Sequence, residues 1–101
     1  MDISTQSKDQ TATIALSGRF DFQVNRPFRE ACEAALKGPG ITVLDLDLSH
    51  IDYMDSSALG MLLLVRERAT ANNQQVLLSG CKGTVKQILD IANFGRLFKM
   101  T

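Results

Sequence analysis

The sequence predicts a single α/β domain in which a mixed sheet of four or five strands is covered by about three helices. A chain of 101 residues is long enough for one compact domain and too short for two ordinary ones. Segments with strand periodicity alternate with helical ones in the order β-β-α-β-α-β-α-β. Strand–helix–strand connections imply parallel neighbours with right-handed crossovers, and a hairpin of the first two strands makes the sheet mixed.

We expect the first two strands to form a hairpin over residues 3–16. Residues 7–10 form a turn-rich cluster between them, and a β-branched-rich strand follows. The pair Ser17 and Gly18 is expected to end this strand, with a loop over residues 19–23 after it. One face of the second strand carries three apolar residues, which are Ala12, Ile14 and Leu16.

The first helix is expected to begin near Asn25, a good capping residue, and to run to Lys37. Pro27 lies in its first turn, where the missing N–H costs little. Gly38-Pro39-Gly40 ends it. The buried face is predicted from helical spacing to be Phe28, Ala31, Cys32, Ala35 and Leu36.

Residues 41–48 form the clearest strand, with Leu44, Leu46 and Leu48 on one side. A connector is expected over residues 49–54. The second helix begins around Ser56 and Ser57 and runs to about Ala71.

Residues 75–79 predict another short strand. A third helix is expected from Thr84 to Ala92, and residues 97–100 form an expected edge strand. The buried stripe of this helix is predicted to be Val85, Ile88, Leu89 and Ala92.

The charge balance argues against a nucleic-acid-binding protein. Lys plus Arg and Asp plus Glu each number 11, so no basic surface is expected. The longest apolar run, residues 58–65, is far below the roughly 20 residues that span a bilayer. With no visible signal peptide, the protein is expected to be soluble and cytoplasmic, without direct insertion into a membrane. Cys32 and Cys81 are expected to be reduced thiols.

No residue pattern predicts an enzyme, a metal site or a cofactor. His50 is the only histidine and lies six residues before Ser56, without an orienting acid or oxyanion motif. Asp45 and Asp47 share one strand face, where solvated acids are favoured over a divalent-cation site. The loop at residues 80–83 places a lysine between glycines, a weak signal for anion binding that is better explained as a turn.

The sequence Asp55-Ser56-Ser57 is the most informative feature of the chain. It places two hydroxyls at the expected start of an apolar helix, where free N–H groups and the helix dipole favour negative charge. One serine is explained as the helix N-cap. The second hydroxyl is free to carry a phosphate.

Residues 46–60, LDLSHIDYMDSSALG, closely resemble the signature of the STAS domain in its bacterial anti-sigma-factor-antagonist branch. Residues 18–21 resemble the Gly-x-Leu-Asp that follows the second strand of that family, and residues 94–99 resemble its Gly-Leu-Phe ending. The resemblance spans almost the whole chain, so residues 1–101 are expected to form a single STAS domain. It implies a mixed four- to five-stranded sheet with about three helices packed on one face. One departure is Ala58 in place of glycine, which favours the helix by roughly 1 kcal/mol.

The resemblance implies a phosphorylation-controlled partner switch rather than an enzyme. Ser56 is the implied phosphorylation site. The unphosphorylated form would bind an anti-sigma factor that is also a serine protein kinase, and this binding would release the sigma factor. Phosphate at Ser56 would block binding, because it adds roughly −1.5 to −2 charges beside Asp55. A PP2C-type phosphatase would reset the switch.

The expected partner-binding residues combine the resemblance with the apolar second helix. Met61 and Leu64 are expected on the part of that helix that does not pack on the sheet, where either a partner or neighbouring helices cover them. The full expected set is Asp21, Asp55, Ser57, Met61 and Leu64.

Two other functions are considered. A STAS accessory subunit of a membrane lipid-type ABC transport complex would brace an ATPase and need no phosphorylation. A small hydrolase using Ser56 and His50 is disfavoured, since nothing orients the histidine.

Overall fold

The sheet holds five strands in the spatial order β1-β2-β3-β4-β5 in the computed structural model, which describes residues 1–101. β1 pairs antiparallel with β2, and the remaining neighbours pair in parallel. The predicted mixed sheet is therefore confirmed. The elements in chain order are β1 (Asp2–Lys8), β2 (Thr11–Phe20), the 3₁₀ helix η1 (Phe22–Val24), α1 (Asn25–Leu36), β3 (Val43–Met54), α2 (Ser56–Ala71), β4 (Gln75–Ser79), α3 (Gly83–Ile91), the 3₁₀ helix η2 (Phe94–Arg96) and β5 (Lys99–Met100).

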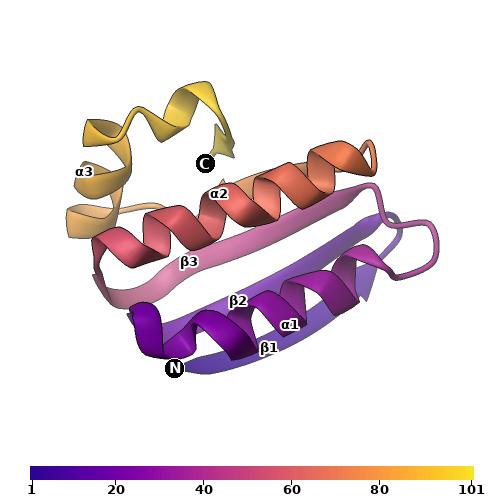
Figure 1. Cartoon of the computed structure of the whole chain (residues 1–101), viewed down its shortest axis with the longest axis horizontal. Helices are drawn as coiled ribbons and strands as arrows, with labels where there is room; N and C mark the ends of the chain where they lie inside the picture. The colour runs from indigo at the N-terminus through magenta and orange to yellow at the C-terminus, as the bar shows by residue number, and fades with distance from the viewer.

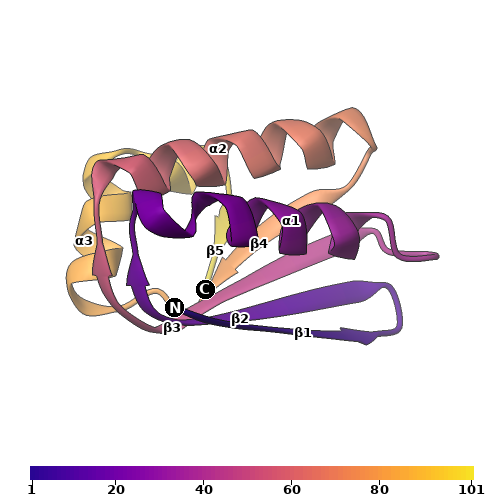
Figure 2. The same cartoon turned by 60° about the horizontal axis from the view of Figure 1, so that its bottom comes forward.

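Helices α1 and α2 lie side by side across one face of the sheet, as Figures 1 and 2 show. α3 lies at the end of the molecule where α2 begins (Figure 1). The opposite face of the sheet carries no helix (Figure 2). None of the helices combines the length and the apolar character needed to cross a membrane.

The core lies between the sheet and the two long helices, and all its buried residues are hydrophobic. Phe20 at the end of β2 packs against Phe28 of α1, with ring centroids 4.9 Å apart. The predicted core faces of β2 and β3 are buried, namely Ala12, Ile14, Leu16, Leu44, Leu46 and Leu48. In α1 and α3 the predicted stripes are buried except for Ala31, Ile88 and Ala92, which are half-buried.

Strands β2 and β3 are longer than the sequence predicts. Neither the expected strand end at Gly18 nor the expected connector over residues 49–54 is correct, because the two strands stay paired as far as Phe20 and Met54. The register shifts twice, opposite Ala15–Ser17 and opposite Gly18–Arg19, and each time β3 has one bulged residue more than β2. Such a bulge breaks the two-residue alternation that identifies a strand.

The helix starts also differ from expectation. α1 begins at Asn25 but has Val24 as its N-cap, with no capping side chain, while Asp21 caps the preceding η1. α2 begins at Ser56 as predicted, but its N-cap is Asp55 rather than a serine. An acid at this position accepts the same N–H groups as a serine and adds a favourable charge.

The turn after β4 brings the backbone of Gly80 against β3. A Cβ at Gly80 would lie 2.6 Å from the Cβ of Ser49 and 2.9 Å from its backbone nitrogen. The residue also has a φ of +68°, in the left-handed region. The loop at residues 80–83 therefore needs glycine at its first position for packing against the sheet.

Candidate functional site

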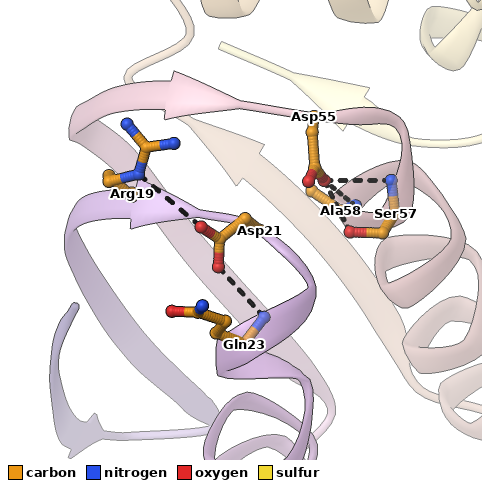
Figure 3. A network of polar contacts seen from close by, with 6 residues as sticks. All are labelled: Arg19, Asp21, Gln23, Asp55, Ser57 and Ala58. Carbon is orange, nitrogen blue, oxygen red and sulfur yellow. Dashed lines mark hydrogen bonds and ion pairs between the residues drawn. The ribbon is translucent and has the colours of Figure 1, made fainter.

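Two loops meet where β2 and β3 end. Phe20 and Met54 are the last paired residues, and the next residue, Asp55, donates its backbone N–H to the Phe20 carbonyl at 3.3 Å. The chain from β2 therefore enters η1 beside the start of α2. Figure 3 shows the polar contacts of the two loops as two separate groups, one around Asp21 and one around Asp55.

The Asp55 carboxylate organises the start of α2. Its Oδ1 atom accepts the backbone N–H of Ser57 at 3.0 Å, the backbone N–H of Ala58 at 3.2 Å and the hydroxyl of Ser57 at 2.5 Å (Figure 3). Two of the free N–H groups of the first helical turn are thus satisfied. Asp55 therefore has a structural task at the start of α2.

These contacts hold the Asp55 side chain in its charged form. The hydrogen bond from the Ser57 hydroxyl is the largest effect and lowers the pKa of Asp55. Burial opposes it in part, and the backbone N–H groups of Ala58 and Ser57 lower the pKa further.

The two serines occupy different positions. The Ser57 hydroxyl is half-buried and donates to Asp55. Ser56 is exposed, and its hydroxyl forms no hydrogen bond within the chain. The structure thus distinguishes a hydroxyl used for capping from one that a partner or an enzyme can reach.

Asp21 lies in the neighbouring loop and is held by its own contacts. Its Oδ1 accepts the Gln23 N–H at 3.0 Å, and its Oδ2 lies 3.6 Å from the Nε of Arg19 (Figure 3). The Arg19 guanidinium also lies 4.0 Å from the centre of the Tyr53 ring, a cation–π contact between β2 and β3. Arg19 and Tyr53 are functional candidates that the sequence analysis did not name.

Two aromatic residues next to these polar groups in the sequence are exposed. Phe22 is 71% exposed and Tyr53 is 42% exposed. Phe22 could have been identified from the sequence, because it is a phenylalanine in a short polar loop directly after the Gly-x-x-Asp stretch of residues 18–21. We call the combined face the two-loop surface, and it consists of Arg19, Asp21, Phe22, Tyr53, Asp55 and Ser56.

The sequence leaves open whether a partner or neighbouring helices cover the apolar residues Met61 and Leu64 of α2. Leu64 is 55% exposed, so it is accessible to a partner. Met61 is 5% exposed, so the chain itself covers it. Helix α1 packs against α2, and Met61 lies at the groove between them together with Phe28 of α1 and Val65 of α2.

The remaining polar candidates lie outside the two-loop surface. Asp45 accepts the Ser79 hydroxyl at 2.6 Å, and Asp47 accepts the Ser49 N–H at 3.0 Å. His50 has its Nδ1 atom 3.1 Å from the Ser49 hydroxyl. From His50 to the end of β3 the strand rises by about 13 Å, at roughly 3.3 Å per residue, which separates the histidine backbone from the start of α2.

Comparisons with known proteins agree with this architecture. The family model described as "Mlab, STAS domain" matches residues 3–99. A STAS-domain-containing protein of Pseudomonas aeruginosa strain UCBPP-PA14 is 46% identical over 91% of this chain and 89% of its own length. The intermembrane phospholipid transport system binding protein MlaB of Escherichia coli K12 is 32% identical over 80% of this chain and 79% of its own length.

Solved structures show the same fold in more distant proteins. The anti-sigma factor antagonist SpoIIAA in its unphosphorylated form superposes with a TM-score of 0.82 at 19% sequence identity. The alignment covers 99% of this chain and 88% of that one. At this identity the likeness concerns the arrangement of strands and helices.

Proposed function

The chain belongs to the STAS domain family, and on that premise we propose that it is the STAS subunit of a membrane phospholipid transport complex, in which it binds the ATPase subunit. The observation that carries this proposal is the 32% identity to the phospholipid transport system binding protein of Escherichia coli, over 80% of this chain. The accessory subunit of a transport complex is therefore preferred to the phosphorylation-controlled partner switch. The anti-sigma factor antagonist SpoIIAA shares the fold but is only 19% identical to this chain. The protein acts as a binding subunit on the cytoplasmic side of the membrane.

The chemistry of the two-loop surface supports binding rather than catalysis. Phe22 and Tyr53 offer exposed aromatic area, and Arg19 offers a cation held over a ring, which are the residue types enriched at the centres of protein interfaces. Asp55 is engaged in capping, and His50 is hydrogen-bonded to Ser49. A hydroxyl without a base in contact does not make a nucleophile.

Binding to the ATPase subunit of the same host is tested by titration calorimetry with the purified full-length proteins. Wild type should bind. Phe22→Ala should weaken binding by about tenfold or more, because central aromatic residues carry most of the energy of an interface. Thr13→Ala is the matched control, since Thr13 lies on β2 away from the two-loop surface. Failure of the wild-type protein to bind the ATPase would overturn the proposal.

A partner switch at Ser56 is the second candidate function, supported by the exposed and unbonded hydroxyl of that residue. A phosphate there would add roughly −1.5 to −2 charges next to Asp55 and would weaken binding to an anti-sigma factor with serine kinase activity. A PP2C-type phosphatase would remove it. The N–H groups at the start of α2 would tolerate the phosphate, so the fold would persist while the interface changed.

Intact-mass measurement of protein purified from its host, with and without phosphatase treatment, tests this switch. A phosphate should be present in wild type and in Ser57→Ala, and absent in Ser56→Ala. In pull-downs with the anti-sigma factor, Ser56→Asp should lose the partner that Ser56→Ala keeps. Phosphate on Ser57, or unchanged binding by Ser56→Asp, contradicts the switch.

A further inference from the structure

We infer that the groove between α1 and α2 continues the two-loop surface and receives a partner segment that places an apolar side chain next to a carboxylate. The inference rests on the proposed function, because the segment belongs to the ATPase subunit. The residues that line the groove belong to α1 and α2, the two helices that lie side by side on one face of the sheet (Figure 2).

The floor of the groove is apolar. The enclosed volume of the groove is only about 20 Å³. The groove is therefore a shallow depression on which side chains of a docked segment can pack, and not a pocket that encloses a ligand. Its lining residues include Phe28, Cys32, Leu36, Met61, Leu64 and Val65.

One side of the groove exposes an apolar side chain to water. Leu64 lines the groove and is 55% exposed, whereas its neighbours Met61 and Val65 are buried. A leucine on an exposed helix is unremarkable alone. Here it borders an apolar recess, so an apolar side chain placed beside it would bury both surfaces at once.

The charges on the rim select an acidic occupant. Arg68 of α2 reaches across to Glu33 of α1 at 3.1 Å, so these two charges neutralise one another. Arg29 also lines the groove, is exposed and forms no ion pair. A carboxylate is the group that complements an unpaired guanidinium, since it accepts two parallel hydrogen bonds.

The groove runs from the two-loop surface toward the far ends of the helices. α1 follows directly after η1, and α2 directly after Asp55, so both helices begin at the two-loop surface and run in the same direction (Figure 1). Asn25 and Met61 line the groove near these starts, and Arg68 and Glu33 bridge it near the other end. A partner bound at the two-loop surface can therefore extend a segment directly into the groove, because the two surfaces adjoin.

The test measures the affinity of the full-length ATPase subunit for three exposed-site variants by titration calorimetry. Arg29→Glu and Leu64→Asp should each weaken binding by about tenfold or more. Arg29→Glu would repel the carboxylate of the partner segment, and Leu64→Asp would place a charge where an apolar side chain packs. Glu67→Ala, an exposed residue of α2 outside the groove, should bind like wild type. Circular dichroism should show the same folded spectrum for all three, because the altered side chains are on the surface.

A photo-crosslinking amino acid at position 64 supplies the second measurement. It should label a stretch of the ATPase that contains an Asp or Glu, and reversal of that acid to Arg should restore binding to Arg29→Glu.

The outcomes separate this inference from the function on which it rests. If wild type fails to bind the ATPase, the proposed function is wrong. If wild type binds and Phe22→Ala weakens binding, but Arg29→Glu and Leu64→Asp bind normally, the function stands and the groove inference is overturned. Self-association that depends on Leu64, or labelling of a second copy of this chain, also overturns it.

Discussion

Asp55 and Ser57 are joined twice, through the hydroxyl of Ser57 at 2.5 Å and through its backbone N–H at 3.0 Å, both at the same carboxylate oxygen. The acid that precedes the serine pair is therefore the helix cap, and the second serine strengthens that cap. This arrangement leaves the hydroxyl of Ser56 exposed at the end of the helix. The division of roles between the serines follows from the position of one carboxylate.

Replacing the cap should affect stability according to the chemistry of the new side chain. Asp55→Asn keeps an oxygen that accepts the first-turn N–H groups, so thermal unfolding should shift little. Asp55→Ala leaves those groups without the carboxylate and should lower the unfolding midpoint clearly more than Asn does. Asp52→Ala, at an exposed position of β3, is the control and should resemble wild type. Equal midpoints for Asp55→Ala and wild type would show that the cap is not needed.

Acid should weaken the fold partly through Asp55. Its pKa is lowered in the folded protein by the Ser57 hydroxyl and the loop N–H groups, so the folded state holds the carboxylate ionised more strongly than the unfolded state does. The resulting stabilisation is fully present above the unfolded pKa of about 3.9 and is lost as the pH falls through the folded value. Urea unfolding between pH 6 and pH 3 should therefore show a steeper loss for wild type than for Asp55→Asn. Parallel curves would contradict this.

Two glycines should respond to alanine in opposite directions. Gly80→Ala should destabilise by about 2 kcal/mol or more, because φ is +68° and the new Cβ would meet Ser49 at 2.6 Å. Gly60→Ala lies in the exposed face of α2, has nothing within 4 Å of the new Cβ, and should stabilise by roughly 0.5–1 kcal/mol. Chemical denaturation of both variants measures the two free energies of unfolding. A Gly80→Ala protein as stable as wild type would be inconsistent with this packing.

Two phenylalanines should separate stability from binding. Phe28→Ala removes a fully buried ring that packs on Phe20 and should cost about 3–5 kcal/mol of unfolding free energy. Phe22→Ala removes a ring that is 71% exposed and should change stability by less than about 0.5 kcal/mol. Guanidinium unfolding compares them directly. A large loss of stability in Phe22→Ala would mean that this ring supports the fold rather than a partner.

The sequence was sufficient for the order of the elements because apolar periodicity is a local property. β4 at Gln75–Ser79 and the span of α2 were predicted as they occur. The lengths of β2 and β3 were not, since a bulge near Gly18 places the buried residues Ile51 and Met54 three positions apart. Pairing between strands distant in sequence kept them extended, and periodicity does not record such pairing.

The candidate site was predicted in part for a similar reason. The Asp55-Ser56-Ser57 motif is contiguous, so its place at a helix start could be inferred from sequence alone. Arg19, Phe22 and Tyr53 reach the same surface only because β2 and β3 end side by side. The burial of Met61 likewise depends on how closely α1 lies against α2, which the sequence of α2 does not contain.

Amide hydrogen exchange of this protein, alone and bound to the ATPase subunit of its host, tests the central claim most directly, because it locates a binding surface without substitutions. The account predicts that binding slows exchange at residues 19–24 and 53–57 and leaves the edge strand β1 unchanged. Unaltered exchange in both loops, with protection confined to β1, would contradict it.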